Sequence, residues 1–220
     1  MVPDLIDAVW ANDVDQIAGK LSGGADPNVK HEGMSALEWA LDLTFAESAL
    51  ALIAADCEVN GGDRTGRTPL MRAAFGDMLA VSKALLAAGA QIHALDDEGG
   101  PALHYAARKG SAATVAWFIN NAGEVNQLDS SGRDALFWAL SWKNFGAIRE
   151  LVNAGADVNR RYGPQGHSLL MLAAIAKDVT SAQFLLDAGA DPQATMVDGK
   201  RASDMAGDDA ALLEALRPKA

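Results

Sequence analysis

The chain has 220 residues, of which half are hydrophobic, and a formal net charge of −11. This length suits one compact domain or one elongated array with a buried core, and the negative charge disfavours nucleic acid and anionic membranes as partners. The single cysteine, Cys57, excludes an internal disulfide, and no apolar run reaches the ~18 residues that a membrane helix needs. We find no signal peptide and expect a cytoplasmic protein, although a signal removed before cloning would leave no trace.

The N-terminal segment PDLIDAVWANDVDQIAGKL, residues 3–21, predicts two short helices. After it, a glycine recurs every 33 residues, with one step of 34: Gly33, Gly66, Gly99, Gly132, Gly166 and Gly199. Leucine stands four residues after each of the first five of these glycines, and a pair of large apolar residues stands 19 and 20 residues after it. A fixed period of this length is typical of a repeat architecture.

Each repeat predicts a turn, a short helix, a second turn and a longer helix, without strand-like alternation. Thr68 stands at a helix cap and Pro69 in the first helical turn, where proline costs no hydrogen bond. Motifs such as GADVN, residues 155–159, end the longer helices on a glycine, which Asp56 and Ala122 replace in two repeats. One inserted residue in RRYGPQG, residues 160–166, predicts a turn of different shape there.

These motifs resemble the ankyrin repeat family, above all GRTPLMRAA at residues 66–74, GGPALHYAA at residues 99–107 and GADVN. The resemblance implies an all-α fold, an ankyrin-like solenoid of helix-turn-helix units with β-turn or hairpin connections. It also implies one ankyrin-repeat domain over residues 1–220. We expect an N-terminal capping unit at residues 1–30, five full repeats at 31–195 and a C-terminal capping unit at 196–220, because terminal repeats of a solenoid are atypical.

In ankyrin-like arrays the turn tips and the first helix of each repeat line one concave face. Carried onto this chain, the resemblance implies a partner-binding face of twelve residues: Trp10, Trp39, Arg64, Arg67, Arg72, Phe75, Tyr105, Arg108, Lys109, Arg133, Trp138 and Trp142. Tryptophan, tyrosine and arginine dominate binding hot spots. The alternative is that large residues six positions after the glycine, such as Trp39 and Trp138, fill the space between neighbouring first helices.

The sequence offers no set of residues suited to catalysis. His31 and His167 fall at predicted turn tips, His93 falls in a link, and His104 takes the place of the family's structural histidine. Cys57 replaces a small residue beside a helix end, which favours an inert packed thiol. No Cys/His spacing suits zinc and no acidic run forms a calcium loop, so we expect no metal and no cofactor.

We therefore predict a non-enzymatic protein–protein interaction module, monomeric when alone, that binds another protein through its concave face. One version is an inhibitor or immunity protein that masks a partner enzyme. The alternative is an enzyme or small-molecule-binding protein that uses the groove. Nucleic acid binding is disfavoured by the net charge, although basic residues gather on the predicted face.

Overall fold

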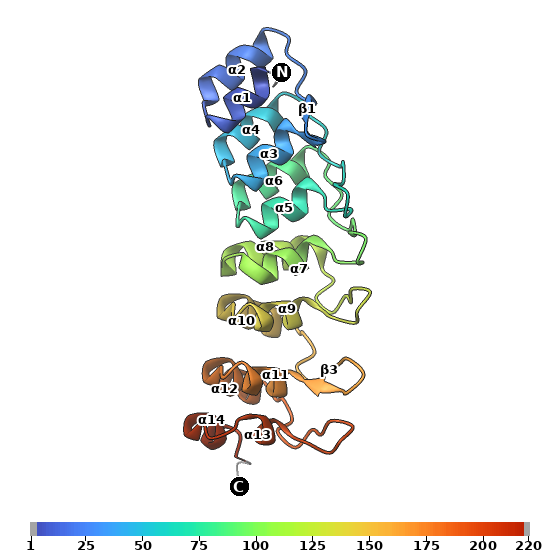
Figure 1. Cartoon of the computed structure of the whole chain (residues 1–220), viewed down its shortest axis with the longest axis vertical. Coiled ribbons are helices and arrows are strands. Elements are labelled where there is room, and N and C mark those ends of the chain that lie inside the picture. The colour runs from blue at the N-terminus through green and yellow to red at the C-terminus, as the bar shows by residue number, and fades with distance from the viewer. Residues whose placement is uncertain (1–3, 218–220) are drawn as a thin grey trace. The chain divides into compact units, whose positions relative to one another are not determined.

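The structure is a computed structural model that describes residues 4–217. These residues form helices of four to eleven residues and two short hairpins (Figure 1). The helices are α1 Asp4–Trp10, α2 Val14–Ser22, α3 Ala36–Asp42, α4 Ala46–Ala54, α5 Pro69–Phe75, α6 Leu79–Ala87, α7 Ala102–Lys109, α8 Ala112–Ala122, α9 Ala135–Ser141, α10 Phe145–Asn153, α11 Leu169–Ile175, α12 Val179–Asp187, α13 Ala202–Met205 and α14 Ala210–Ala215. No helix within the described range has the length and apolarity to cross a membrane.

The odd-numbered helices, here called first helices, begin at a fixed place relative to the glycines. Ser35, Thr68, Asp134 and Ser168, each two residues after a glycine, cap α3, α5, α9 and α11 by accepting a hydrogen bond from a backbone N–H of the first turn. Such caps satisfy backbone groups that a helix start leaves unpaired. The turn chemistry read from the sequence therefore determines where each of these helices starts.

The hairpins lie in the turns that precede α3 and α11. Strand β1, Lys30–His31, pairs with β2, Met34–Ser35, and strand β3, Arg161–Tyr162, pairs with β4, His167–Ser168, both antiparallel. Glu32 and Gly33 form the first loop, both with positive φ, as two-residue hairpin loops require. The second loop contains residues 163–166, so the turn that carries the inserted residue has a longer loop than the first.

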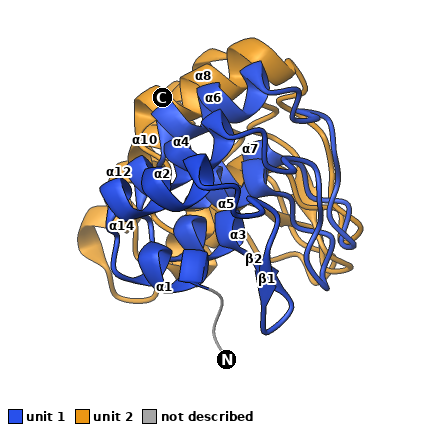
Figure 2. Ribbon diagram, turned by 90° about the horizontal axis from the view of Figure 1, so that it is seen from above, with its two compact units in different colours: residues 1–106 blue, residues 107–220 orange. Residues whose placement is uncertain are grey.

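The chain divides into two compact units, residues 1–106 and residues 107–220, shown in two colours in Figure 2. In unit 1, α1 packs on α3 and α3 on α5, while the second helices α2, α4 and α6 pack in the same order. In unit 2, α9, α11 and α13 form one such row and α8, α10, α12 and α14 another. Each unit is therefore a stack of helix pairs, as a repeat array requires.

The leucine ladder forms the core. The leucines four residues after the glycines are at most 2% exposed, and so are their counterparts in the second helices, such as Leu52, Leu85 and Leu151. Cys57 is also buried, and burial raises the pKa of its thiol to about 11. A thiol with such a pKa is protonated and unreactive at neutral pH, which agrees with the packed role expected from the sequence.

In the two repeats without the closing glycine, the longer helix ends in two different ways. Asp56 itself adopts a left-handed backbone with φ of 57°, a conformation that aspartate tolerates better than most residues. Helix α8 instead continues to Ala122 and ends on Gly123, which has φ of 71°. The predicted division into caps and five repeats stays a prediction, and residues 1–3 and 218–220 of the caps lie outside the described residues.

Asparagines at the end of the GADVN motif and of its counterparts in other repeats link successive turns. Asn126 donates to the Gly155 carbonyl at 3.1 Å and accepts from the Asp157 amide at 2.9 Å. Asn159 makes the same pair of bonds to Gly189 and Asp191. These asparagines therefore satisfy backbone groups of the following helix end, a role that explains the recurrence of the residue type.

Candidate functional site

Three first helices are tied to the preceding turn by an aspartate. Asp63, Asp96 and Asp129 stand three residues before a glycine, and each accepts hydrogen bonds from two backbone amides of its own turn. Each also accepts a side-chain hydrogen bond from the residue nine positions later, which is Arg72, Tyr105 or Trp138 in turn. Three of the predicted site residues are thus held in place by the turn before them.

Arg72 lies in a network of acidic side chains within unit 1. Its guanidinium pairs with Asp63 at 2.7 Å, with Glu38 at 3.8 Å and with Asp42. The arginine side chain is only 8% exposed. Of the other basic residues predicted here, Arg67 is exposed but pairs with Asp63 at 2.9 Å, and Arg64 is exposed at the turn tip.

Asp63 is the centre of this network. Partial burial opposes its ionisation, but hydrogen bonds from Thr65 and Arg67 and the charge of Arg67 outweigh it and lower the pKa of the carboxyl to about 2. Partial burial likewise opposes the ionisation of Asp129, and hydrogen bonds from Arg133 and Ser131 with the Arg133 charge lower its pKa. These two turns therefore favour a charged aspartate.

We expect Asp63→Asn to lower the free energy of unfolding by up to about 2 kcal/mol at neutral pH. A lowered folded-state pKa contributes stability above the unfolded pKa of about 4, and this contribution is lost as the pH falls through about 2. The difference from the unsubstituted chain should therefore shrink between pH 4 and pH 2 in urea unfolding followed by circular dichroism. Asp208→Asn, at an exposed position, is the control, and a difference that persists at pH 2 would contradict the assignment.

Tyr105 is buried in α7, with 7% of its surface exposed, and its hydroxyl donates to Asp96. Phe75, at the end of α5, is half-buried. At the start of unit 1, Trp10 is 37% exposed and contacts the rings of Trp39 and His31 edge-on, each with centroids 5.3 Å away. The solvent exposure of the large side chains at the predicted positions therefore ranges from buried, at Tyr105, to exposed, at Trp10.

Unit 2 brings five of the predicted residues together around α9. The guanidinium carbons of Arg108 and Arg133 lie 3.7 Å and 4.3 Å from the centroid of the Trp138 ring, a geometry in which the cation attracts the ring. The Trp138 indole donates to Asp129 at 3.2 Å, and Arg133 Nε donates to the same carboxylate at 2.9 Å. Trp138 is half-buried, and its ring is in contact with two cations.

Trp142 follows one helical turn after Trp138 and is the most accessible of the predicted aromatic residues, with 44% of its surface exposed. The Lys109 ammonium, at the end of α7, lies 5.7 Å from its ring centroid. Residues four apart on a helix share a face. We therefore define the cation–aromatic cluster of unit 2 as Arg108, Lys109, Arg133, Trp138 and Trp142.

Sequence reasoning missed a second, buried network in unit 2. The Tyr162 hydroxyl donates to Asp134 at 2.9 Å, the Arg160 guanidinium pairs with the same carboxylate at 3.0 Å, and the Phe137 amide donates to it at 2.9 Å. Burial, which exceeds the opposing effect of these partners, raises the pKa of Asp134. Aspartate in place of the usual Ser or Thr cap was the signal in the sequence.

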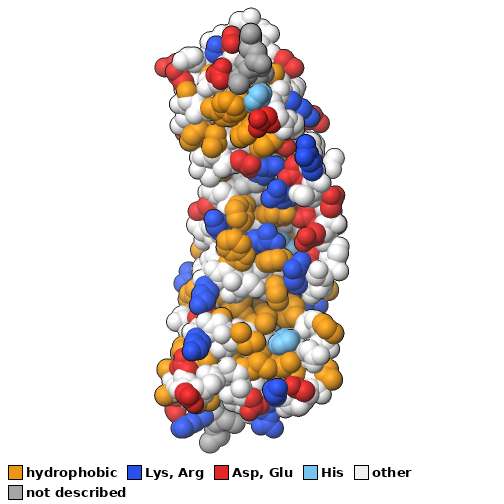
Figure 3. Space-filling model, viewed as in Figure 1, with side chains coloured by type: hydrophobic (Ala, Val, Ile, Leu, Met, Phe, Trp, Pro, Cys, Tyr) orange, Lys and Arg blue, Asp and Glu red, His pale blue; other side chains and the backbone are white. Residues whose placement is uncertain are grey.

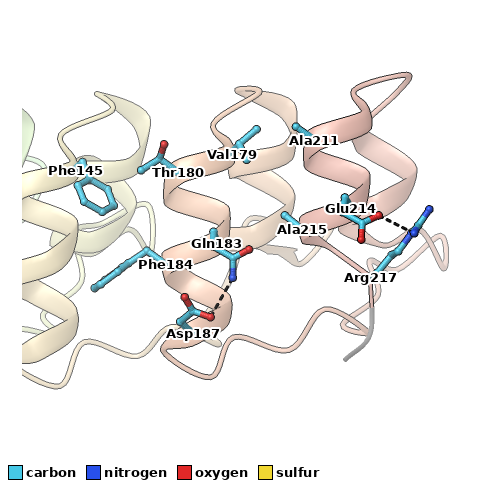
Figure 4. Close-up of a pocket in the computed structure, with 10 residues that line it drawn as sticks. All are labelled: Phe145, Val179, Thr180, Gln183, Phe184, Asp187, Ala211, Glu214, Ala215 and Arg217. Atoms are coloured by element: carbon cyan, nitrogen blue, oxygen red, sulfur yellow. Dashed lines mark hydrogen bonds and ion pairs between the residues drawn. The ribbon is translucent and has the colours of Figure 1, made fainter. Parts of the chain in front are cut away.

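The second helices of unit 2 carry an open pocket of about 850 Å³ (Figure 4). At one side of the pocket, the rings of Phe145 and Phe184 contact each other edge-on, with their centroids 5.5 Å apart. The acidic residues that line it already bind neighbours, since Asp187 accepts from Gln183 at 3.0 Å and Glu214 pairs with Arg217 at 2.6 Å. The pocket includes none of the twelve predicted residues and offers an apolar wall rather than a converging set of catalytic groups.

Within residues 4–217, no group of three or more His, Cys, Asp or Glu side chains is arranged to hold a metal ion. His104 is buried, at 2% exposure, within α7. His31 contacts Trp10, and His93 is exposed in the link after α6.

Comparison with known proteins agrees with the helix-pair architecture. Residues 5–96, 76–162 and 103–196 each match the family described as ankyrin repeats in three copies, and a search of curated proteins finds no match. The human ASB11 ankyrin repeat domain is similar in structure, with a TM-score of 0.84 and 23% identity over 100% of both chains. The ankyrin repeat domain of Bcl-3, described as a unique member of the IkappaB protein family, has a TM-score of 0.77 and 22% identity over 99% of both chains.

At these identities the similarity to solved structures concerns the fold. The family match is independent of it and extends over most of the chain. Together with the glycine ladder, the first-helix caps and the leucine core, it confirms the resemblance: the chain belongs to the ankyrin repeat family.

Proposed function

We propose that the chain binds a protein partner through the face formed by its first helices and the turns before them, without catalysing a reaction. Ankyrin repeat domains typically mediate protein–protein interactions. The twelve predicted residues remain the proposed binding set, in the cytoplasm, on the face that the family resemblance identifies as concave. Within this set we expect Trp10, Trp142 and the exposed basic residues to contact the partner directly, and Arg72 and Tyr105 to support them.

The observation that carries the proposal is the cation–aromatic cluster of unit 2. Arg108, Arg133 and Asp129 hold Trp138 by ring and hydrogen-bond contacts, so little side-chain entropy remains to be lost on binding. Trp142 then presents a large accessible ring beside this fixed one. Aromatic and arginine side chains in such settings often contribute ~2 kcal/mol or more to binding.

The proposal has a narrower version, in which the partner is an enzyme that the chain inhibits or to which it confers immunity. Identification of the partner tests this version directly. The alternative function, binding or conversion of a small molecule, would use a groove. The pocket of unit 2 lies instead on α10, α12 and α14, with its acidic residues bonded to neighbours.

We expect Trp142→Ala to weaken partner binding tenfold or more, since ~1.4 kcal/mol is tenfold. The test captures proteins from the source cell on the immobilised full chain and quantifies them by mass spectrometry. Phe145→Ala is the matched control, because Phe145 is also an exposed aromatic residue, at 37%, but lines the pocket on the second helices. Loss of a captured protein with both variants, or with Phe145→Ala alone, would contradict the proposed face.

A further inference from the structure

The charge of the chain is unevenly distributed. The whole chain holds 18 Lys and Arg against 29 Asp and Glu, whereas residues 107–177 hold eight Lys and Arg against five Asp and Glu. A net positive segment thus lies within a strongly acidic protein. Figure 3, in the view of Figure 1, shows Lys and Arg beside hydrophobic side chains over the part of unit 2 that carries α9 and α11, with few acidic side chains there.

One exposed part of this segment is a strip along the ends of α7, α9 and α11. We define the turn strip as Lys109, Trp142, Lys143, Ile175 and Lys177, all of which are exposed. Its apolar members are 44% exposed at Trp142 and 54% exposed at Ile175. The Lys143 ammonium donates to the Ala176 carbonyl at 3.1 Å, which ties the end of α9 to the end of α11.

The acidic residues closest in sequence to Lys143 and Lys177 each bind a neighbouring side chain. Asp178 caps α12, accepting from the Ser181 amide at 3.0 Å and from the Ser181 hydroxyl at 2.5 Å. Glu150 pairs with Arg149 at 3.7 Å, and Asp134 pairs with Arg160 at 3.0 Å. The strip therefore combines basic and apolar side chains without an acidic member.

We propose that the turn strip binds an acidic segment of the partner, with carboxylates opposite Lys109, Lys143 and Lys177 and apolar side chains against Trp142 and Ile175. This inference rests on the proposed function and adds the chemistry of the partner. Complementary charge selects partners and speeds association, and a segment with like charge would be repelled. At physiological salt, charges beyond ~8 Å are screened, so the local strip outweighs the overall charge of −11.

The test uses two fluorescein-labelled peptides of equal length, one of Glu-Leu-Glu repeats and one of Lys-Leu-Lys repeats, and a labelled oligothymidylate. Fluorescence anisotropy with the full chain at physiological salt should show binding of the acidic peptide and no binding of the other two. Lys143→Glu with Lys177→Glu should weaken that binding tenfold or more. Both lysines have positive φ, as does Asp77, which occupies the same turn place in unit 1, so an acidic residue is compatible with this backbone.

The matched control is Lys83→Glu with Arg149→Glu, exposed positions on α6 and α10 that change the net charge equally. Equal loss with both double variants, or tighter binding of the basic peptide or the oligothymidylate, would overturn the inference. The proposed function fails separately, in the comparison of Trp142→Ala with Phe145→Ala. If Trp142→Ala loses the captured protein but the unsubstituted chain does not bind the acidic peptide, the proposed function is supported and this inference is overturned.

Discussion

Replacement of Asp134 by alanine is expected to lower the free energy of unfolding by about 3 kcal/mol. The substitution leaves the buried Tyr162 hydroxyl and the partly buried Arg160 guanidinium without their acceptor, and it removes the cap of α9. An uncompensated buried polar group costs more than the intact pair contributes, and loss of an aspartate cap alone costs about 1 kcal/mol. One carboxylate therefore binds three groups, the Tyr162 hydroxyl, the Arg160 guanidinium and the first turn of α9.

Urea unfolding followed by circular dichroism measures this effect. Asp157→Ala is the matched control, because Asp157 lies 3.9 Å from the same arginine but its side chain is 50% exposed, and exposed pairs contribute at most about 1 kcal/mol. Tyr162→Phe should cost less than Asp134→Ala, since Arg160 and the Phe137 amide still bind the carboxylate. An Asp134→Ala variant as stable as Asp157→Ala would show that the network is not needed for folding.

Leu85→Ala is expected to destabilise the chain by ~2–5 kcal/mol, because Leu85 is completely buried in α6 and its truncation leaves a cavity. Tyr105→Ala should approach this cost, since Tyr105 is 7% exposed and its hydroxyl binds Asp96. Trp142→Ala should cost about 1 kcal/mol or less, because nearly half of the ring already faces solvent.

We would measure thermal unfolding, urea unfolding and partner capture on the same samples of the three variants. These measurements distinguish residues that pack the core from residues that bind the partner. We expect Trp142→Ala to lose capture while it keeps its stability, and Leu85→Ala to lose stability first. A Trp142→Ala variant as unstable as Leu85→Ala would make Trp142 a packing residue.

The fold could be predicted from the sequence because its determinants are local and periodic. The glycine spacing gives the turns, residues such as Thr68 and Asp134 give the helix starts, and the leucine ladder gives the buried face. The inserted residue in RRYGPQG indicated a turn of different shape, and the structure has a hairpin with a four-residue loop, residues 163–166, there. The helix end at Gly123 was not predicted, because a helix can extend by one residue when the next glycine supplies the left-handed conformation.

The candidate site could be predicted only by position. The residues six places after the glycine are chemically different, and their exposure depends on partners that periodicity does not specify. Arg72 pairs with three acidic residues up to 34 positions away and its side chain is only 8% exposed, whereas the Trp138 ring contacts two arginines. One signal was present in the sequence, an aspartate nine residues before Arg72, Tyr105 and Trp138, and the bonds it makes are visible only in three dimensions.

The most direct test of the account places a photo-crosslinking amino acid, p-benzoylphenylalanine, at position 142 or at position 145 of the full chain in the source cell. Irradiation followed by mass spectrometry should join position 142 to one defined protein, through a peptide rich in Asp and Glu, and should join position 145 to none. Crosslinks to the same protein from position 145 alone, or from neither position while the protein is still captured, would contradict binding through the first-helix face.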